Sequence, residues 1–406
     1  MSDTAADSVP ASRSSQTDPL GLHEALRTQV RGDVKFDHGS RALYATDGSN
    51  YRQVPIGVVL PRDADDVLAA ISVCREFGAP LLCRGGGTSL AGQCCNVAVV
   101  LDFTKYMGNI LEIDPERRIA RVQPGVVLDH LRNAAEKYHL TFAPDPASHD
   151  RCTIGGMIGN NSCGVHSIMG GKTDDNIEAL EIVTYDGIRL SVAQNQIQAG
   201  ATTARVGADA FVRPATLSEA MGSVPEPGAP SQPSGDSRPR LSGGPELSGR
   251  SAFARADQIA STLKQIAETY ADQIRQKFPN IPRRVSGYNL NYLLPGNGFH
   301  IARSLVGSEG TCATILEATC RLIESPPSRV LVVLAYPDIY QCADHIPKSS
   351  STSPSGSKAS MTCSSTTSAQ KGSTRKGSHC CRKAADGSWS SSAPNPSPAQ
   401  KCRPSA

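Results

Sequence analysis

The chain has 406 residues, enough for two domains and a sizeable core. It contains no run of 18 apolar residues and its first 16 residues are polar and small, which excludes a membrane-spanning segment and a secretory signal. The net charge is +3, but residues 348–406 carry nine Lys or Arg against one acid, and removing that +8 leaves −5 for the remainder. This acidic remainder argues against nucleic acid as a partner.

The spacing of the cysteines and the lack of a secretory signal indicate the cellular compartment. Thirteen cysteines are scattered along the chain, and no two of them have the CxxC spacing of zinc or iron–sulfur sites. We therefore predict reduced thiols and no metal site. We expect a cytoplasmic location, with peripheral association at the inner face of the membrane as the alternative.

The first predicted elements follow a polar leader, residues 1–20, that we expect to be disordered. Residues 57–60 form a short apolar strand, and a helix follows, capped by Asp63 and stopped by Gly78. Residues 81–83 and 98–101 are further apolar runs typical of buried strands. This part, residues 21–194, is predicted to be the first globular block.

The pattern then changes to hairpins and longer helices. We predict a hairpin over 114–117, a helix over 126–138 and a second hairpin over Asp186-Gly187. Residues 195–252 are rich in Gly, Pro, Ser and Ala, which predicts a disordered insertion. An amphipathic helix over 254–278 opens the second block, residues 253–328. Strands and helices in this order predict an α+β fold rather than a regular βαβ series.

The first motif is a glycine-rich loop directly after an apolar strand. Residues 84–93 read Arg-Gly-Gly-Gly-Thr-Ser-Leu-Ala-Gly-Gln. Without Cβ atoms, backbone N–H groups can converge on an anion, and Thr88 and Ser89 add hydroxyl donors. The loop is neither G-x-G-x-x-G nor a P-loop, so a glycine-rich connector is the alternative. We also expect Gly86→Val to block an anionic ligand while leaving the core intact.

The second motif covers residues 143–164 and combines prolines with glycines. Pro144 and Pro146 stiffen a turn, and the four later glycines keep the backbone thin at Gly155, Gly156, Gly159 and Gly164. We predict that this long segment is neither helix nor strand. Such a segment suits a flat ligand lying against the main chain.

The third motif is the Leu-Val-Gly-Ser-Glu-Gly-Thr stretch at residues 305–311. Gly307 and Gly310 allow a sharp turn that presents Ser308, Glu309 and their amides. Taken alone, an ordinary tight turn between two elements explains this motif equally well.

Together and in this order, the three motifs resemble the vanillyl-alcohol-oxidase-type (PCMH-type) FAD-binding domain of the FAD-linked oxidases. The D-lactate, glycolate and 2-hydroxyglutarate dehydrogenase branch is the most similar, in particular the N-terminal half of its long bacterial members with FAD and iron–sulfur parts. The resemblance covers residues 40–194 and 255–346. It implies a two-subdomain PCMH-type FAD-binding fold followed by an α+β cap domain, truncated here.

The resemblance assigns cofactor contacts residue by residue. It places the FAD pyrophosphate at the glycine loop, the ribityl chain and isoalloxazine along the second motif, and the third motif as the loop that closes the site. The assigned residues are Arg84, Gly85, Gly86, Gly87, Thr88, Ser89, Gly92, Pro144, Ser148, Ile154, Gly155, Gly156, Asn160, Gly164, Ile182, Glu309 and Gly310. Thr88 stands where tethered members of the family have a histidine, so we expect non-covalent FAD.

The resemblance also implies a reaction. A D-2-hydroxy acid of the D-lactate, glycolate or 2-hydroxyglutarate type is oxidised to the 2-oxo acid, and electrons pass to a separate acceptor such as a quinone, a cytochrome or an iron–sulfur module. An iron–sulfur cluster would belong only to a full-length form. A sugar-alcohol or aldonolactone oxidase, or a catalytically inactive FAD-binding fragment, are the alternatives.

The catalytic base is not identified from the sequence. Arg284 is a candidate for holding a substrate carboxylate, with a solvated basic turn as the other interpretation. Tyr288 lies in the same stretch. His166 follows the second motif and is a candidate for substrate contact, against the interpretation of a packed loop histidine.

The C-terminal part changes character within the predicted cap. Residues 330–336 are predicted to be the first strand of a cap domain that begins at 329 and breaks off after Pro347. Residues 348–406 contain 18 serines and no Leu, Ile, Val, Phe or Tyr, so they cannot form a core. Possible codons for this tail, read in a frame shifted by one nucleotide, can encode a globular-looking segment. We interpret the tail as a frameshift product, with a disordered tail as the alternative.

Overall fold

The computed structural model describes residues 18–199 and 249–350, except Pro282, Arg329, Leu331 and Val333. The expectations for the leader before Asp18, for residues 200–248 and for the tail beyond Ser350 lie outside the described residues. The chain divides into two compact units with the boundary between Pro327 and Ser328.

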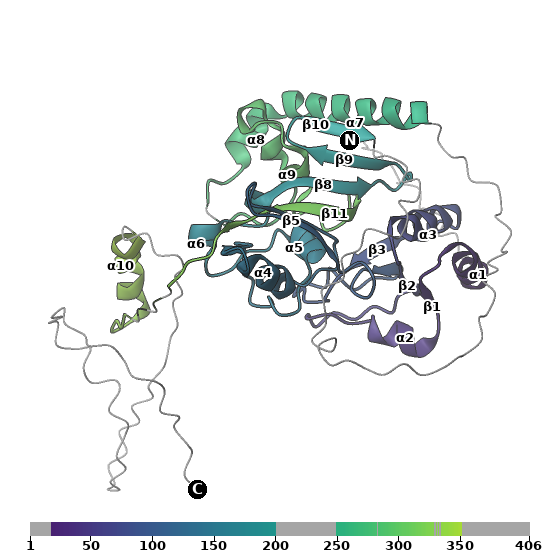
Figure 1. Ribbon diagram of the computed structural model, residues 1–406, viewed down its shortest axis with the longest axis horizontal. Coiled ribbons are helices and arrows are strands. Elements are labelled where there is room, and N and C mark those ends of the chain that lie inside the picture. The colour runs from purple at the N-terminus through teal and green to yellow at the C-terminus, as the bar shows by residue number, and fades with distance from the viewer. Residues whose placement is uncertain are drawn as a thin grey trace, which may run out of the picture. The chain divides into compact units, whose positions relative to one another are not determined.

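The first sheet of the larger unit has four strands in the order β1-β2-β4-β3 (Figure 1). β2, β4 and β3 are parallel and β1 is antiparallel to β2. All residues of β2 and β4 are buried, which explains why both strands are apolar except for Asp102 at the end of β4. The bounds are β1 Asp33–Lys35, β2 Gly57–Leu60, β3 Leu81–Arg84 and β4 Val99–Asp102.

Helices α1 (Pro19–Gln29) and α3 (Ala64–Glu76) pack together and share a core with this sheet. The predicted cap of α3 is confirmed, because the Asp63 carboxylate accepts hydrogen bonds from the backbone N–H groups of Asp65 and Asp66. The predicted stop is confirmed as well, since α3 ends just before Gly78, which has φ +61°.

The second sheet has six antiparallel strands in the order β10-β9-β8-β11-β6-β5. Both predicted hairpins are confirmed, as the pairs β5–β6 and β8–β9. β11 comes from the second block and lies between β8 and β6, so the sheet combines both blocks. The bounds are β5 Ile110–Asp114, β6 Ile119–Val122, β8 Ile177–Val183, β9 Arg189–Ala193, β10 Gln196–Ala199 and β11 Thr314–Arg321.

Helices and short elements complete the larger unit. The long helix α7 (Gly249–Thr269) runs beside β10, and α9 (Ile301–Leu305) contacts β8 and β9 (Figure 1). The other elements are α2 His38–Leu43, α4 Leu128–Glu136, β7 Leu140–Thr141, α5 Ile154–Asn160, α6 Ser167–Gly170, η1 Asp174–Asn176, α8 Ala271–Lys277, η3 Leu290–Leu293, η4 Pro295–Asn297 and β12 Ile323–Glu324.

Three sequence predictions need correction here. The two ends of the predicted disordered insertion, 195–252, have regular structure, because β10 occupies residues 196–199 and α7 begins at Gly249. The predicted helix over 254–278 is two helices, α7 and α8, that meet at Tyr270. The second motif is not free of regular structure, because Thr153 caps α5 within it by accepting a hydrogen bond from the Gly156 N–H.

The smaller unit contains helix α10 (Ile339–Ser350). The predicted strand over 330–336 is wrong for the residues described there, which have no strand structure. A strand needs a neighbour for its backbone hydrogen bonds, and Val330, Val332 and Leu334 instead lie 87, 67 and 58% exposed. In the described part of the chain no helix is long and apolar enough to cross a membrane.

Candidate functional site

A cleft in the larger unit brings all three motifs together. Its wall is made by β3 and the glycine loop, by the start of α5 with Pro124, and by the turn at Glu309. The lining residues are Cys83, Arg84, Gly85, Ser89, Gln93, Cys94, Phe103, Pro124, Thr153, Gly155, Gly156, Gly159, Glu309, Gly310, Ala313 and Ile315.

The glycine loop packs closely against the residues that precede α5. A Cβ atom on Gly85 would lie 2.0 Å from Thr153 Oγ1, and one on Gly86 would lie 2.2 Å from the Arg151 carbonyl oxygen. Gly87 has φ +64°, a left-handed conformation that favours glycine. The first glycines of the motif are thus required by packing within the protein itself.

The guanidinium of Arg84 fixes the loop through hydrogen bonds to backbone carbonyl groups. Its Nη1 donates to the carbonyl oxygens of Tyr44 at 3.2 Å and Cys94 at 2.9 Å, and its Nη2 donates to that of Thr46 at 2.8 Å. The guanidinium also lies 5.2 Å from the centre of the Tyr44 ring. These contacts use the planar fork of arginine to join both ends of the loop to residues 44–46.

Three glycines of the lining differ from those of the loop, because the protein leaves space beside them. A Cβ on Gly159 would have no neighbour closer than 3.7 Å, and one on Gly310 none closer than 3.9 Å. A Cβ on Gly156 would meet only Thr153 Oγ1, at 3.3 Å. Side chains at these positions would stand in the cleft, so their absence leaves the backbone open to a ligand.

The turn at Glu309 docks on the last part of α5. The Gly307 N–H donates to the Ile158 carbonyl at 2.8 Å, and the Glu309 N–H donates to the Gly159 carbonyl at 3.0 Å. Glu309 has φ +53°, an uncommon conformation for a residue with a side chain. The turn thereby brings the Glu309 carboxylate to the wall of the cleft.

Two amides face this carboxylate. Asn160 Nδ2 donates to Glu309 Oε1 at 3.1 Å, and Gln93 Nε2 lies 3.5 Å from the same oxygen. Burial raises the pKa of Glu309, and the two amide hydrogen bonds act in the opposite direction. One carboxylate thus connects all three motifs.

The cleft contains part of the residue set predicted from the sequence. It is lined by Arg84, Gly85, Ser89, Gly155, Gly156, Glu309 and Gly310, and Asn160 touches it through Glu309. Ile182 instead lies in β8, 4% exposed and part of the hydrophobic core. The predicted residues outside the lining are Gly86, Gly87, Thr88, Gly92, Pro144, Ser148, Ile154, Asn160, Gly164 and Ile182.

Several lining residues were not predicted. Thr153 could have been found, because a threonine before Ile-Gly-Gly fits a helix cap. Gln93 ends the first motif but carries no signal of its own. Cys83, Phe103, Pro124 and Ile315 reach the cleft only through the pairing of distant strands and loops.

The three weak catalytic candidates lie outside the cleft lining. His166 bonds through Nδ1 to the Asp145 carboxylate, and its backbone N–H donates to the same side chain at 3.1 Å. Arg284 donates to Asn291 Oδ1 at 2.6 Å. Tyr288 is 2.9 Å from Thr311 Oγ1, one residue beyond the lining residue Gly310. Of the three, Tyr288 is therefore connected most directly to the cleft.

Comparison with known proteins gives the class of this domain. Residues 55–193 match a family model described as an FAD binding domain. D-2-hydroxyglutarate dehydrogenase of Pseudomonas putida is 31% identical over 318 residues, which are 77% of this chain and 27% of the relative. Glycolate oxidase subunit GlcD of Escherichia coli is 37% identical over 178 residues, 43% of this chain and 35% of the relative.

One solved structure, an alkyldihydroxyacetonephosphate synthase, is 15% identical with a TM-score of 0.45, over 76% of this chain and 44% of its own. The chain spans only 27% of the length of the first D-2-hydroxyglutarate dehydrogenases that it matches. Residues 55–193, which supply most of the cleft lining, are thus similar to an FAD binding domain. The resemblance indicated by the sequence motifs agrees with this match and with the relatives found.

The residues present fit such a cofactor. Gly156, Gly159 and Gly310 line the cleft without side chains that would cover the backbone. A flat ring system can therefore lie against the main chain at these positions. Ser89 and Thr153 bring hydroxyl groups to the same cleft.

Proposed function

We propose that FAD binds without a covalent link in the glycine-lined cleft. The backbone around Gly85 to Ser89 would hold the phosphates, and Gly156, Gly159 and the Glu309 turn would hold the flavin. The observation that carries the proposal is the convergence of three motifs, distant in sequence, on one cleft inside a domain of FAD-binding class.

The reaction proposed is oxidation of a D-2-hydroxy acid to the 2-oxo acid, with electrons passed on to a separate acceptor. The names of the relatives, D-2-hydroxyglutarate dehydrogenase and glycolate oxidase subunit, support this substrate class. When bound, FAD supplies the two-electron oxidation of the substrate Cα–H bond. A quinone, a cytochrome or an iron–sulfur module is the class of acceptor we propose.

The chain's own residues would position the partners of this reaction. Arg84 keeps the loop in the conformation that its three carbonyl contacts define. Glu309 orients Asn160 and Gln93 at the cleft wall. We propose Tyr288 as the first residue to test for substrate contact, because its hydroxyl meets Thr311 beside Gly310.

The test uses the full chain, stripped of flavin and titrated with FAD while flavin fluorescence is followed. The loaded protein is then mixed, without oxygen, with D-2-hydroxyglutarate, D-lactate, glycolate and the L-enantiomers. We expect saturable FAD binding and loss of the visible flavin absorption with one D-acid or with glycolate. A chain that does not bind FAD would overturn the site, and FAD binding without reduction by any of the acids would overturn the reaction.

A separate measurement tests the attachment of the cofactor. After acid denaturation and centrifugation, all flavin should be in the supernatant. Flavin that stays with the protein pellet would contradict non-covalent binding.

A further inference from the structure

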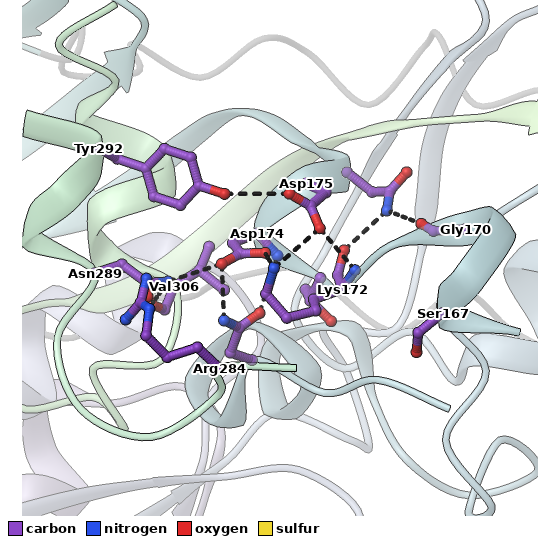
Figure 2. A network of polar contacts seen from close by, with 12 residues as sticks. Ser167, Gly170, Lys172, Asp174, Asp175, Arg284, Asn289, Tyr292 and Val306 are labelled. Carbon is purple, nitrogen blue, oxygen red and sulfur yellow. Dashed lines mark hydrogen bonds and ion pairs between the residues drawn. The ribbon is translucent and has the colours of Figure 1, made fainter. Parts of the chain in front are cut away.

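A buried group of polar side chains reaches Val306, three residues before Glu309 (Figure 2). Its centre is Asp174, which is fully buried at the start of η1. Asp174 Oδ2 accepts hydrogen bonds from Asn161 Nδ2 at 2.9 Å and from Asn289 Nδ2 at 3.1 Å. Its Oδ1 lies 3.2 Å from Lys172 Nζ. Such a carboxylate is stable in the interior only with all of these partners.

Both amide partners of Asp174 contact segments that adjoin the Glu309 turn. Asn289 Nδ2 also donates to the Val306 carbonyl at 2.8 Å, one residue before Gly307. Asn161 is the residue that ends α5, with φ +51°, and a Cβ on Gly307 would lie 3.4 Å from the Asn161 Cβ. Asp174 therefore joins the end of α5 to the chain that enters the turn.

The neighbouring Asp175 has a different set of partners in the described structure. It accepts hydrogen bonds from the Lys172 backbone at 2.9 Å, from Lys172 Nζ at 3.1 Å and from the Tyr292 hydroxyl at 3.2 Å. The Tyr292 hydroxyl bonds to Asp175, whereas the Asn289 amide bonds to Asp174 and to Val306 (Figure 2). The two aspartates thus share Lys172, but only Asp174 is linked to the turn.

We propose that Asp174 is a positioning residue for the cofactor site, which sets the affinity for FAD by fixing the Glu309 turn against the end of α5. The inference rests on the proposed function, since it takes the cleft as the FAD site. It assigns no contact between Asp174 and the cofactor. Its effect passes through Asn161 and Asn289 to the backbone that presents Glu309.

The variant Asp174→Asn tests this inference because asparagine keeps the shape and removes the acceptor charge. The single amide oxygen can face either Lys172 or the amides of Asn161 and Asn289. Even when it faces the two amides, their hydrogen bonds lose the charge of the carboxylate and become weaker. Asp175→Asn is the matched control, since it also removes a partner of Lys172. FAD titration of the stripped full-length chain is the readout, with thermal unfolding of each variant without FAD beside it.

We expect Asp174→Asn to raise the Kd for FAD about tenfold, the equivalent of about 1.4 kcal/mol, and Asp175→Asn to change it less than about twofold. Both should lower the unfolding temperature of the FAD-free chain, since both remove an ion pair from Lys172. Equal Kd values for Asp174→Asn and wild type would overturn the positioning role alone. A wild-type chain that does not bind FAD would overturn the proposed function together with it.

Two further variants separate positioning from general loss of structure. If Asp174 acts through the turn, Asp174→Asn should change the Kd for FAD little when Glu309→Ala is already present. Full additivity of the two effects would contradict the inference. If Asp174→Asn does not fold, Asn289→Ser breaks the same link and keeps the Asp174–Lys172 pair. It should weaken FAD binding to a similar extent, and an unchanged Kd would overturn the proposal.

Discussion

The backbone N–H of Glu309 donates to the carbonyl oxygen of Gly159 at 3.0 Å, across 150 positions of the sequence. This bond fixes the distance between the third motif and the helix inside the second motif. Gly159 and Glu309 both line the cleft, so the same contact makes them neighbours in its wall. The site is therefore held together by backbone contacts between the two blocks of the chain.

The first prediction concerns Gly159, where a side chain would enter the cleft. Gly159→Val should raise the Kd for FAD at least about tenfold, because the new side chain occupies ligand space. The FAD-free chain should be no less stable, since valine is a better helix residue than glycine. Gly296→Val is the matched control, because a Cβ there meets no atom within 4 Å and Gly296 does not line the cleft. Tight FAD binding by Gly159→Val would place the cofactor elsewhere.

Gly86 should behave differently from Gly159. Gly86→Val should also disturb the packing of the glycine loop, because its Cβ would lie 2.2 Å from the Arg151 carbonyl oxygen. We predict that this variant unfolds at a lower temperature even without FAD, with a free-energy cost of about 2 kcal/mol from forced overpacking. Thermal unfolding of the stripped protein checks this, and an unchanged unfolding temperature would contradict it.

Arg84 provides a test of the loop conformation. Arg84→Lys retains the charge but offers a single ammonium group where three carbonyl oxygens need donors. At least one of these part-buried or exposed carbonyl oxygens would lose its donor, at a cost of about 1 kcal/mol. We expect weaker FAD binding and faster proteolysis within residues 85–94. The same protease pattern as wild type would show that the loop does not depend on these bonds.

The pH dependence of the free energy of unfolding should reveal the protonation of His300, the buried histidine that caps α9. Burial, and next the charge of Arg303, lower the pKa of His300 from 6.5 to about 4. The folded state therefore keeps His300 neutral while the unfolded chain binds a proton below pH 6.5. The contribution of His300 to the free energy of unfolding is therefore fully present above about pH 6.5. It falls as the pH drops towards 4, by about 3 kcal/mol over this pH range.

His300→Asn is the control for that pH dependence. Asparagine is a good capping residue and does not titrate, so it can replace the His300 side chain as acceptor for the Arg303 N–H. Urea unfolding at several pH values should show a shallower slope between pH 6.5 and 4 for the variant. An identical slope would mean that other groups cause the acid sensitivity.

Sequence patterns that act within a few residues predicted much of the fold. The features that they missed depend on contacts between residues far apart in the sequence. The Asp63 cap, Gly78 and the turn at Asp186-Gly187 act within a few residues, so the sequence alone shows them. The place of β11 between β8 and β6 depends on pairing across more than 100 positions, which no local pattern encodes. The role of Asp174 is hidden for the same reason, because its partners Asn161 and Asn289 lie far apart in the sequence.

The last prediction concerns the apolar side chains at the start of the smaller unit. Val330, Val332 and Leu334 alternate along the chain and are each more than half exposed. Each Å² of apolar surface left in water forgoes about 25 cal/mol of burial free energy, and contiguous apolar patches promote association. We expect the triple variant Val330→Thr, Val332→Thr and Leu334→Thr to aggregate less than wild type, measured by light scattering at rising concentration. Threonine keeps the β-branched shape of valine, so the change acts on polarity. Leu20→Thr with Leu43→Thr is the control, because those leucines are 81 and 77% exposed but far apart in the sequence. If the control lowers aggregation as much as the triple variant does, the alternating stripe has no special role.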